Sequence, residues 1–391
     1  MDINEKLKIF ETIEEAIFYL IRNNISDDNF YNDLYKLTSL LGDLVNLKPP
    51  SENKGIEYLM ELNQWLGYVK ALVDFSAPLP EYDNSKINID IEFRKLVNFV
   101  NDNSLKSLED YMVAQFKRID ILNRKNISNY TKKYPLWGDI NYQTGKGSMV
   151  TDRANCLKEH INDFIWIYNR FCDYRSRYVL YAILKYWITY DFNLLGATKE
   201  PIFNDYFDLD LLILGENDVI ADVGAFIGDT ALQITQVYNK CKKVYCYEID
   251  PNNATKVKNL SMELPFIELR QKAASNENGI IYLDLNSQDS SSSKTTKNGN
   301  LEVEAVTLDS DIKEPLSLIK MDIEGAEQMA IQGCINHIKN NRSKLAICTY
   351  HNNEDIWKIP RMIDNMRNDY NFYMRYNGGN LFPTEYVFFA L

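Results

Sequence analysis

Two carboxylates and two glycines stand where apolar segments meet helical patterns, and together they could bind a nucleotide. Asp222 lies within the apolar run 219–223, and Gly224 and Gly228 follow before a helical spacing begins. Glycine can take a positive φ and leaves room for a ligand, and the N–H groups that begin a helix have no partner within it. Glu248 ends the next apolar run, where a carboxylate can accept hydrogen bonds from both hydroxyls of a ribose.

The glycine spacing indicates which nucleotide would fit. A dinucleotide fingerprint reads G-x-G-x-x-G, whereas this turn reads G-x-x-x-G and lacks a cradle for a pyrophosphate. Asp222 would repel a diphosphate and attract the cationic end of S-adenosylmethionine. The residues therefore favour a sulfonium cofactor, and a nucleotide-dependent oxidoreductase is the rival interpretation.

Three segments resemble motifs of the FkbM-type methyltransferases, which use S-adenosylmethionine and have the class I fold. They are residues 222–230, 247–251 and 319–327, and the resemblance covers roughly residues 165 to 391. The commoner class I pattern has a third glycine where Phe226 stands, so we expect this side chain to shape the pocket wall. The resemblance implies S-adenosylmethionine as the cofactor.

The predicted cofactor-binding residues follow the ends of four strands, because open parallel sheets bind ligands at the carboxyl ends of their strands. After the third strand, backbone groups near Ala273 are expected to face the adenine, as the resemblance also implies. Asp322, after the fourth strand, could hold the methionine amino group. The full predicted set is Asp222, Gly224, Ala225, Phe226, Gly228, Asp229, Thr230, Glu248, Asp250, Ala273 and Asp322.

Three residues near the last strand ends are the predicted catalytic groups. Methyl transfer needs an acceptor aligned with the methyl group and stripped of its proton. His351 is the first choice for general base, because an imidazole titrates near neutrality. Asp322 is the second choice for general base; alternatively, it orients the substrate. Glu324 either takes part in catalysis or stabilises the start of the next helix through its dipole.

No metal is part of this prediction. Asp322, Glu324 and His351 carry ligand atoms that would suit magnesium or another divalent ion, but the sequence does not show whether they converge.

The elements that would position these residues alternate between strand and helix, which predicts parallel pairing through right-handed crossovers. Two further apolar runs at the end of the chain, with Gly378 and Gly379 between them, predict an antiparallel hairpin. The predicted fold class is α/β. We expect a seven-stranded, Rossmann-like sheet of the class I methyltransferase type together with an all-α N-terminal domain. The resemblance also implies a reversed edge strand. The expected strands are residues 219–223, 243–248, 266–271, 316–322, 344–350, 370–376 and 385–390.

Length and periodicity indicate more than one domain. Residues 1–125 show amphipathic helical spacing without a catalytic motif, and residues 126–150 look like a connection rich in polar residues and tyrosine. We predict a helical N-terminal domain at 1–125, a linker at 126–150, and a methyltransferase domain with a helical lead-in at 151–391. The helical domain would recognise the substrate, form a homodimer or cap the fold. The linker aromatics either stack on a sugar ring or are buried.

Composition limits the partners and the compartment. A net charge of −12 would repel nucleic acid and anionic membranes at long range. The chain has no apolar stretch of about 18 residues, and its first residues do not resemble a signal peptide. The six cysteines form no C-x-x-C pair. We therefore expect a cytoplasmic protein with no membrane span and no nucleic-acid partner.

Together these features predict an S-adenosylmethionine-dependent O-methyltransferase. Members of the family that the chain resembles usually methylate hydroxyls, so the expected acceptor is a hydroxyl of a sugar, glycan or related metabolite. One alternative is an N-methyltransferase acting on an amine of a glycan-linked or amino-acid group. The other is a non-catalytic binding protein that keeps the fold, against which the intact acidic and glycine positions argue.

Overall fold

The computed structural model describes residues 88–391 except 204–205, 239–240, 285–293 and 296–300. Residues Asn88–Leu391 form one compact unit. The helical patterns expected before residue 88 lie outside the described residues, and the domain boundaries at 125 and 150 stay a prediction. The segment predicted as a linker contains the end of one helix and a short 3₁₀ turn, Pro135–Trp137 (η1).

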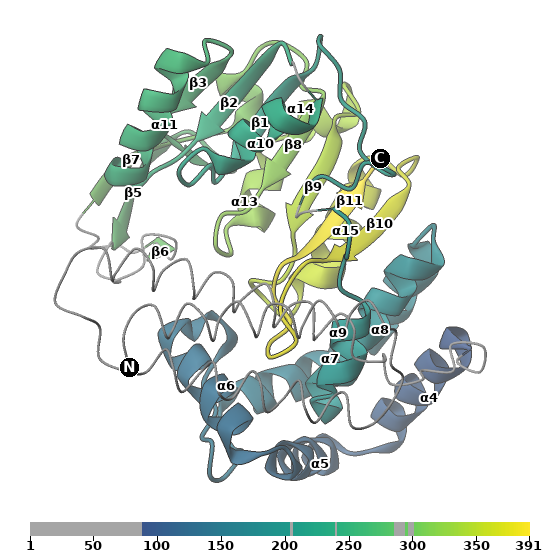
Figure 1. Cartoon of the computed structure of the whole chain (residues 1–391). Helices are drawn as coiled ribbons and strands as arrows, with labels where there is room; N and C mark the ends of the chain where they lie inside the picture. The colour runs from purple at the N-terminus through teal and green to yellow at the C-terminus, as the bar shows by residue number, and fades with distance from the viewer. Residues whose placement is uncertain (1–87, 204–205, 239–240, 285–293, 296–300) are drawn as a thin grey trace, which may run out of the picture. The chain divides into compact units, whose positions relative to one another are not determined.

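A seven-stranded sheet carries the strand ends of interest, in the order β10-β11-β9-β8-β1-β2-β3 (Figure 1). The five strands from β9 to β3 pair in parallel, which confirms the predicted α/β class. The strands are β1 (Val219–Val223), β2 (Lys243–Tyr247), β3 (Ile267–Arg270), β8 (Leu318–Met321), β9 (Lys344–Cys348), β10 (Phe372–Tyr376) and β11 (Tyr386–Ala390).

The C-terminal hairpin is antiparallel as predicted, but the reversed strand does not lie at the edge of the sheet. β11 pairs antiparallel with both β9 and β10, so it is the second strand and β10 takes the edge. All residues of β11 are buried, whereas β10 has a half-buried position. A continuous apolar run is stabilised by neighbours on both sides, which explains why the last strand inserts between the other two.

Helices cover the sheet and connect its strands. α8 packs against β10, and α7 packs against α15, which ties the first described helices to the β10 end of the sheet. The longer helices are α4 (Ile89–Asp102), α5 (Leu105–Arg118), α6 (Ile121–Lys133), α7 (Ser148–Arg170), α8 (Tyr174–Thr189), α10 (Asp229–Tyr238), α11 (Pro251–Glu263) and α15 (Asp355–Met366). The short ones are α9 (Phe192–Ala197), α12 (Leu308–Asp311), α13 (Glu327–Gln332) and α14 (Ile335–Lys339).

A second, four-stranded sheet continues from the end of β3 in the order β4-β7-β5-β6. Its strands are β4 (Ala273–Ala274), β5 (Gly279–Asp284), β6 (Lys294–Thr295) and β7 (Leu301–Val306). β4 pairs in parallel with β7, and β7 pairs antiparallel with β5. This sheet places Ala273 beside the strand ends of the main sheet.

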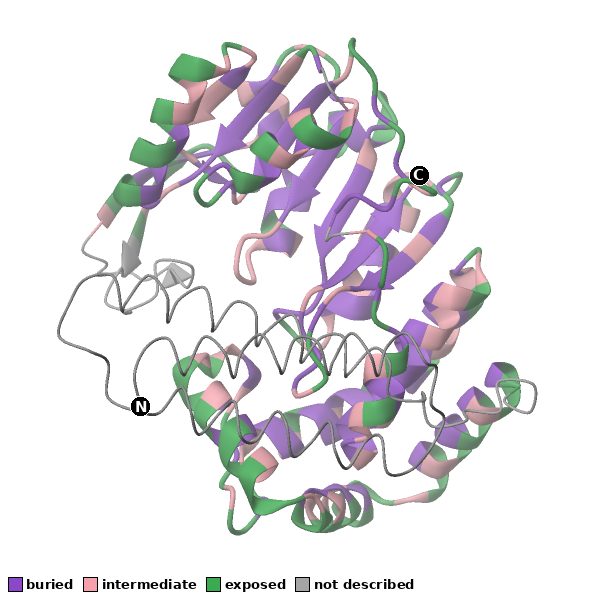
Figure 2. Ribbon diagram, viewed as in Figure 1, coloured by how far each residue is buried: buried purple, intermediate pink, exposed green. Residues whose placement is uncertain are grey.

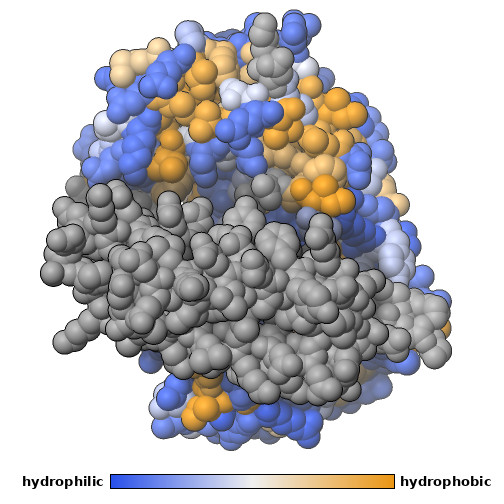
Figure 3. All heavy atoms as spheres, viewed as in Figure 1, coloured by the Kyte–Doolittle hydropathy of each residue, from blue (hydrophilic) through white to orange (hydrophobic). Residues whose placement is uncertain are grey.

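Burial follows the main sheet, while exposed positions gather on the outer faces of the helices (Figure 2). All five residues of β1 are buried. On the face shown in Figure 3, hydrophobic and hydrophilic side chains are interspersed over the described sheet region. Within the described residues, no helix is long and apolar enough to cross a membrane.

The turn between β1 and α10 depends on a glycine. Gly224 has a φ of 81°, and a Cβ built on it would overlap the backbone carbonyl oxygen of Asp322. A side chain at this position would therefore force the two strand ends apart and strain the backbone. The close approach of the two loops explains why a glycine follows Asp222.

We expect Gly224→Ala to destabilise the protein by about 2–4 kcal/mol, because left-handed strain and overlap with backbone add together. Gly215→Ala is the matched control, because a Cβ there meets no atom within 4 Å, and it should change stability by less than about 0.5 kcal/mol. Urea unfolding of both variants measures the difference. Equal stability of the two variants would contradict the close packing inferred at Gly224.

Candidate functional site

The carboxyl ends of β1, β2 and β8 surround a cavity of about 640 Å³. Its walls come from the turn after β1, from Glu248 after β2, from β4, and from the loop after β8. Both the position and the volume are those of small-molecule sites in open α/β sheets. The cavity therefore lies where the sequence predicted a ligand.

The predicted site residues divide between the cavity wall and the layer behind it. Those that line the cavity are Gly224, Phe226, Asp229, Thr230, Glu248, Ala273, Asp322 and Glu324. Those that do not line it are Asp222, Ala225, Gly228, Asp250 and His351. Their cofactor-binding and catalytic roles stay predictions.

Asp222 makes its close contact with a lysine of the neighbouring strand. Its Oδ1 lies 3.0 Å from Nζ of Lys320, and both side chains are almost completely buried. Burial raises the pKa of Asp222, and the ammonium of Lys320 acts in the opposite direction. Lys320 Nζ also donates a hydrogen bond to the carbonyl of Gly224 at 2.7 Å. Asp222 thus holds the glycine turn through Lys320.

Sequence reasoning missed Lys320, although a signal was present. A lysine inside an apolar strand has to be neutralised by a buried acid, and Asp222 in the adjacent strand was available. The sheet register places the two residues directly opposite each other.

Glu248 and Asp250 have different surroundings. Glu248 lines the cavity, its carboxylate accepts the N–H of Asp250 at 2.7 Å, and burial raises its pKa to about 7. The side chain of Asp250 instead accepts the N–H groups of Asn252 and Asn253 and caps α11. Glu248 is therefore placed to meet a ligand, while Asp250 fixes the start of the helix behind it.

Phe226 shapes the cavity wall, as the missing third glycine predicted. Its φ is 48°, an uncommon value for a residue with a side chain, and the side chain lines the cavity. Asp229 and Thr230 begin α10 beside it and also line the cavity. This wall combines an aromatic ring with a helix N-terminus.

His351 is completely buried among three carboxylates. Its Nε2 lies 3.4 Å from Oδ1 of Asp322 and 3.5 Å from Oε2 of Glu324, and its Nδ1 lies 2.9 Å from Oε1 of Glu327. Burial alone would lower the pKa of His351, but the carboxylates outweigh it and raise the pKa to about 10. An imidazole that already holds a proton cannot accept another, which disfavours the predicted role as base at neutral pH.

Asp322 and Glu324 differ in their charge. Asp322 accepts a hydrogen bond from Tyr206 at 2.8 Å; burial works against its ionisation, but His351 and Lys320 hold its pKa below the usual value. Burial raises the pKa of Glu324 to about 7 despite His351. Glu324 also has a φ of 56°, so its backbone is strained where its side chain enters the cavity wall.

Aromatic residues from outside the sheet close the cavity. Tyr130, Tyr134 and Trp137, from the segment predicted as a linker, line it together with Tyr350. Trp137 donates its indole N–H to the carbonyl of Tyr350 at 2.6 Å. Trp137 is buried and also lines the cavity, so burial is observed for this residue and stacking of the linker aromatics on a sugar ring stays a prediction.

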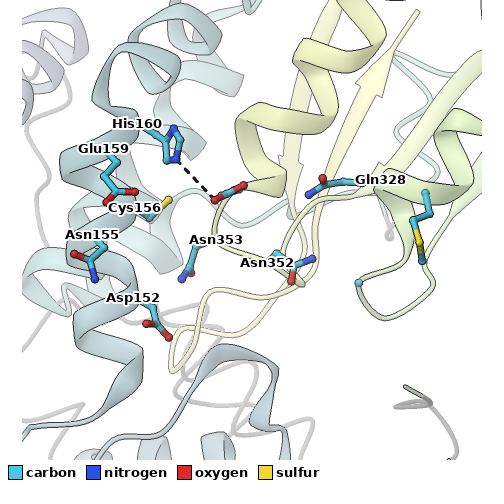
Figure 4. Close-up of a pocket in the computed structure, with 11 residues that line it drawn as sticks. Asp152, Asn155, Cys156, Glu159, His160, Gln328, Asn352 and Asn353 are labelled. Carbon is cyan, nitrogen blue, oxygen red and sulfur yellow. Dashed lines mark ion pairs between the residues drawn. The ribbon is translucent and has the colours of Figure 1, made fainter. Parts of the chain in front are cut away.

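A second cavity of about 550 Å³ adjoins the loop after β8 (Figure 4). Polar side chains of α7 face Gln328 of α13 and others from the loop after β9, and Met329 belongs to both cavities. His160 Nε2 lies 3.8 Å from a carboxylate oxygen of Glu354, the ion pair dashed in Figure 4. The labelled side chains are Asp152, Asn155, Cys156, Glu159, His160, Gln328, Asn352 and Asn353.

Comparisons with known proteins also indicate a methyltransferase fold. Residues 222–374 match the family model of the methyltransferase FkbM domain. A crystal structure of Methyltransferase FkbM from Methylobacillus flagellatus KT is similar with a TM-score of 0.54 and 23% identity. The match covers 62% of this chain and only 61% of that chain. At this identity the likeness shows the fold.

Two more distant solved structures carry no argument of their own. A putative methyltransferase from Streptococcus mutans in complex with SAH has a TM-score of 0.30 and 13% identity, covering 46% of this chain and 90% of that chain. Aeropyrum pernix fibrillarin with natively bound S-adenosyl-L-methionine has a TM-score of 0.30 and 11% identity, covering 46% and 69%. No curated protein sequence matches the chain.

Because Asp222 and Lys320 form a buried ion pair, we expect their substitutions to have strongly coupled effects on stability. Asp222→Asn leaves an unneutralised buried ammonium, and Lys320→Met leaves an unneutralised buried carboxylate, so each should cost about 3–5 kcal/mol of stability. The double variant should be clearly more stable than the sum of the two losses predicts. Urea unfolding of all four proteins measures the coupling, and simple additivity would show that the contact contributes nothing.

Proposed function

We propose that the protein transfers a methyl group from S-adenosylmethionine to a hydroxyl of a sugar, glycan or related metabolite, because residues 222–374 match the family model of the methyltransferase FkbM domain. The observation that supports this best is the cavity that the turn after β1 and Glu248 share with Asp322 and Glu324. One end offers the groups that an adenosyl cofactor needs, and the other offers carboxylates and aromatic rings for an acceptor.

The adenosine would occupy the side of the cavity at β2 and β4. The carboxylate of Glu248 would accept the ribose hydroxyls. Ala273 and Ala274 leave room for the adenine beside the second sheet, and Phe226 also lines the cavity. The methionine part would then extend toward Asp322, as the sequence predicts.

The charge of the cavity favours a sulfonium over a diphosphate. Asp229, Asp322 and Glu324 line it. The two lysines in the wall already have carboxylate partners: Lys320 pairs with Asp222, and Lys272 pairs with Glu304 and Asp311. A dinucleotide would bring its pyrophosphate into this acidic surrounding without a spare cation, which argues against the oxidoreductase alternative.

A sugar suits the acceptor side because this side combines rings and carboxylates. Tyr130, Tyr134 and Trp137 offer apolar faces for a pyranose ring, and Asp322 and Glu324 offer acceptors for its hydroxyls. A bound hydroxyl would attack the methyl carbon in line with the breaking C–S bond. The bonding electrons move to sulfur, and the hydroxyl proton leaves to water.

An amine is the second candidate acceptor, and the same wall supports it. Aromatic faces and carboxylates together attract a cationic ammonium group. A nucleic acid fits less well, because acidic lining would repel its phosphates. The cysteines of the described residues are all free, which is in keeping with a reducing compartment such as the cytoplasm. A homodimer through the N-terminal residues stays a prediction.

Calorimetry tests the cofactor. We expect both S-adenosylmethionine and S-adenosylhomocysteine to bind the full-length protein, and NAD⁺ not to bind, because the lining lacks a free cation for its diphosphate. Absence of binding by both adenosyl compounds in folded protein would remove the proposed function. Transfer of a labelled methyl group to a native extract, with mass spectrometry of the product, then shows whether the methyl group is on oxygen or nitrogen.

Glu248 predicts a pH dependence of cofactor binding. Its pKa of about 7 in the free protein means that the ionised form, which accepts the ribose hydroxyls, is gained as the pH rises through 7. Between pH 8 and pH 6 the ionised fraction falls about tenfold, so the affinity for S-adenosylhomocysteine should fall by a similar factor. Glu248→Gln should bind more weakly at pH 8 and lose this part of the pH dependence. Identical pH profiles would contradict the ribose contact.

A further inference from the structure

Two carboxylate oxygens from the loop after β8 lie near a ring nitrogen of His351, which follows β9. His351 Nε2 lies 3.4 Å from Asp322 Oδ1 and 3.5 Å from Glu324 Oε2. Atoms bound to one metal ion at about 2.1 Å are separated by about 3.0–3.4 Å, depending on the coordination angle. Each carboxylate oxygen is therefore separated from His351 Nε2 by about the distance that lies between two ligands of one ion.

The buried imidazole has carboxylates near both of its ring nitrogens. His351 is completely buried, Nδ1 faces Glu327, and Nε2 makes no hydrogen bond of good geometry with any group of the described residues. Its Nε2 points between the carboxylates of Asp322 and Glu324. A buried ring nitrogen aimed at two carboxylates needs either a proton or a metal ion between them.

Glu327 is placed to orient the ring from the other side. Its Oε1 lies 2.9 Å from His351 Nδ1, and its two oxygens accept the N–H groups of Ile323 and Gly325 at 2.8 and 3.0 Å. Metal-binding histidines commonly have a carboxylate at the second ring nitrogen, which fixes the tautomer and leaves Nε2 for the metal. Because its oxygens are occupied, Glu327 suits this outer position better than a ligand position.

The charge around the cluster also calls for a cation. Asp322, Glu324 and Glu327 surround His351, and the completely buried Asp355 lies close enough to feel the charge of Glu327. The nearby cation Lys320 is already paired with Asp222. Several carboxylates therefore share one imidazole, an arrangement that a divalent ion would stabilise.

We propose that His351, Asp322 and Glu324 bind one divalent transition metal ion, with Glu327 holding the imidazole in place. One nitrogen and two oxygen ligands suit Mn²⁺, Fe²⁺ or Zn²⁺ better than Mg²⁺. The sequence alone assigns no metal here, because it does not show whether these side chains converge.

The catalytic part of the inference rests on the proposed function. Asp322 and Glu324 line the cavity, so the remaining coordination positions would face the acceptor. A hydroxyl bound to the ion loses its proton to water more easily than a free hydroxyl. Its oxygen then forms the bond to the methyl carbon as the C–S bond breaks. The ion would thus activate the acceptor in place of a general base.

Titration of the chelator-treated full-length protein with Mn²⁺, followed by the electron paramagnetic resonance of free Mn²⁺, tests the site. We expect a single Mn²⁺ to bind per chain. Glu324→Gln and Asp322→Asn should each weaken binding by about tenfold or more, because each removes a ligand. Glu327→Gln, which keeps all three ligands, should weaken it by about 10–100-fold if it orients the ring. Circular dichroism confirms that each variant is folded.

Glu354→Gln is the matched control. His160 also lies near two carboxylates, those of Asp163 and Glu354, but these two carboxylates have further partners in the protein. Asp163 pairs with Arg361 and Glu354 pairs with Lys358, so cations of the protein already neutralise them. This variant should keep the Mn²⁺ affinity of the unchanged protein. No Mn²⁺ binding, or the same affinity in Glu324→Gln as in Glu354→Gln, would overturn the proposed site.

Binding of S-adenosylhomocysteine to the same preparation separates this inference from the proposed function. Cofactor binding without Mn²⁺ binding overturns the metal site and leaves the methyltransferase proposal intact. Mn²⁺ binding that depends on Glu324, without cofactor binding, supports the metal site and removes the proposed function.

Discussion

The contact between Asp222 and Lys320 sets the arrangement on which the site depends. The two residues are direct partners in the register of β1 and β8, and their charged groups lie 3.0 Å apart with almost no exposure to solvent. A shift of the register by one residue would turn every side chain of a strand to its other face and separate the pair. An unpaired charge in the sheet interior would cost several kcal/mol. The pair therefore fixes where both strands end.

The position of the cluster around His351 follows from this register. Asp322 lies two residues after Lys320, so it continues the same side of β8 and reaches the cavity at the strand end. Gly224 leaves space for the Asp322 carbonyl, and Glu327 binds two N–H groups of the loop that carries Glu324. The same Glu327 contacts His351, which lies in the loop after β9. One carboxylate thus connects the loops of two strands.

The sequence predicted the parts of the fold and the site that depend on local patterns. The apolar runs predicted the strands, and the glycine turn and Glu248 were found because their spacing along the chain is fixed. The capping role of Asp250 could also have been predicted, because Asp before Pro251 is a common helix start. The roles of Lys320, Glu327 and Trp137 depend on pairing and packing between distant segments, which periodicity does not encode. The inward position of β11 was missed for the same reason.

The acidic cavity implies a balance between stability and binding. Burial raises the pKa of Glu248 and Glu324 to about 7, and among the described residues neither carboxylate has a lysine as an ion-pair partner. A buried carboxylate destabilises the protein while it is charged, and a ligand that satisfies it recovers that energy on binding. Ribose hydroxyls would do this at Glu248, and a cation would do it at Glu324. The two carboxylates therefore favour different ligands by the same physical principle. Burial makes each carboxylate costly to ionise, so a ligand that stabilises its charge gains that energy as part of the binding energy.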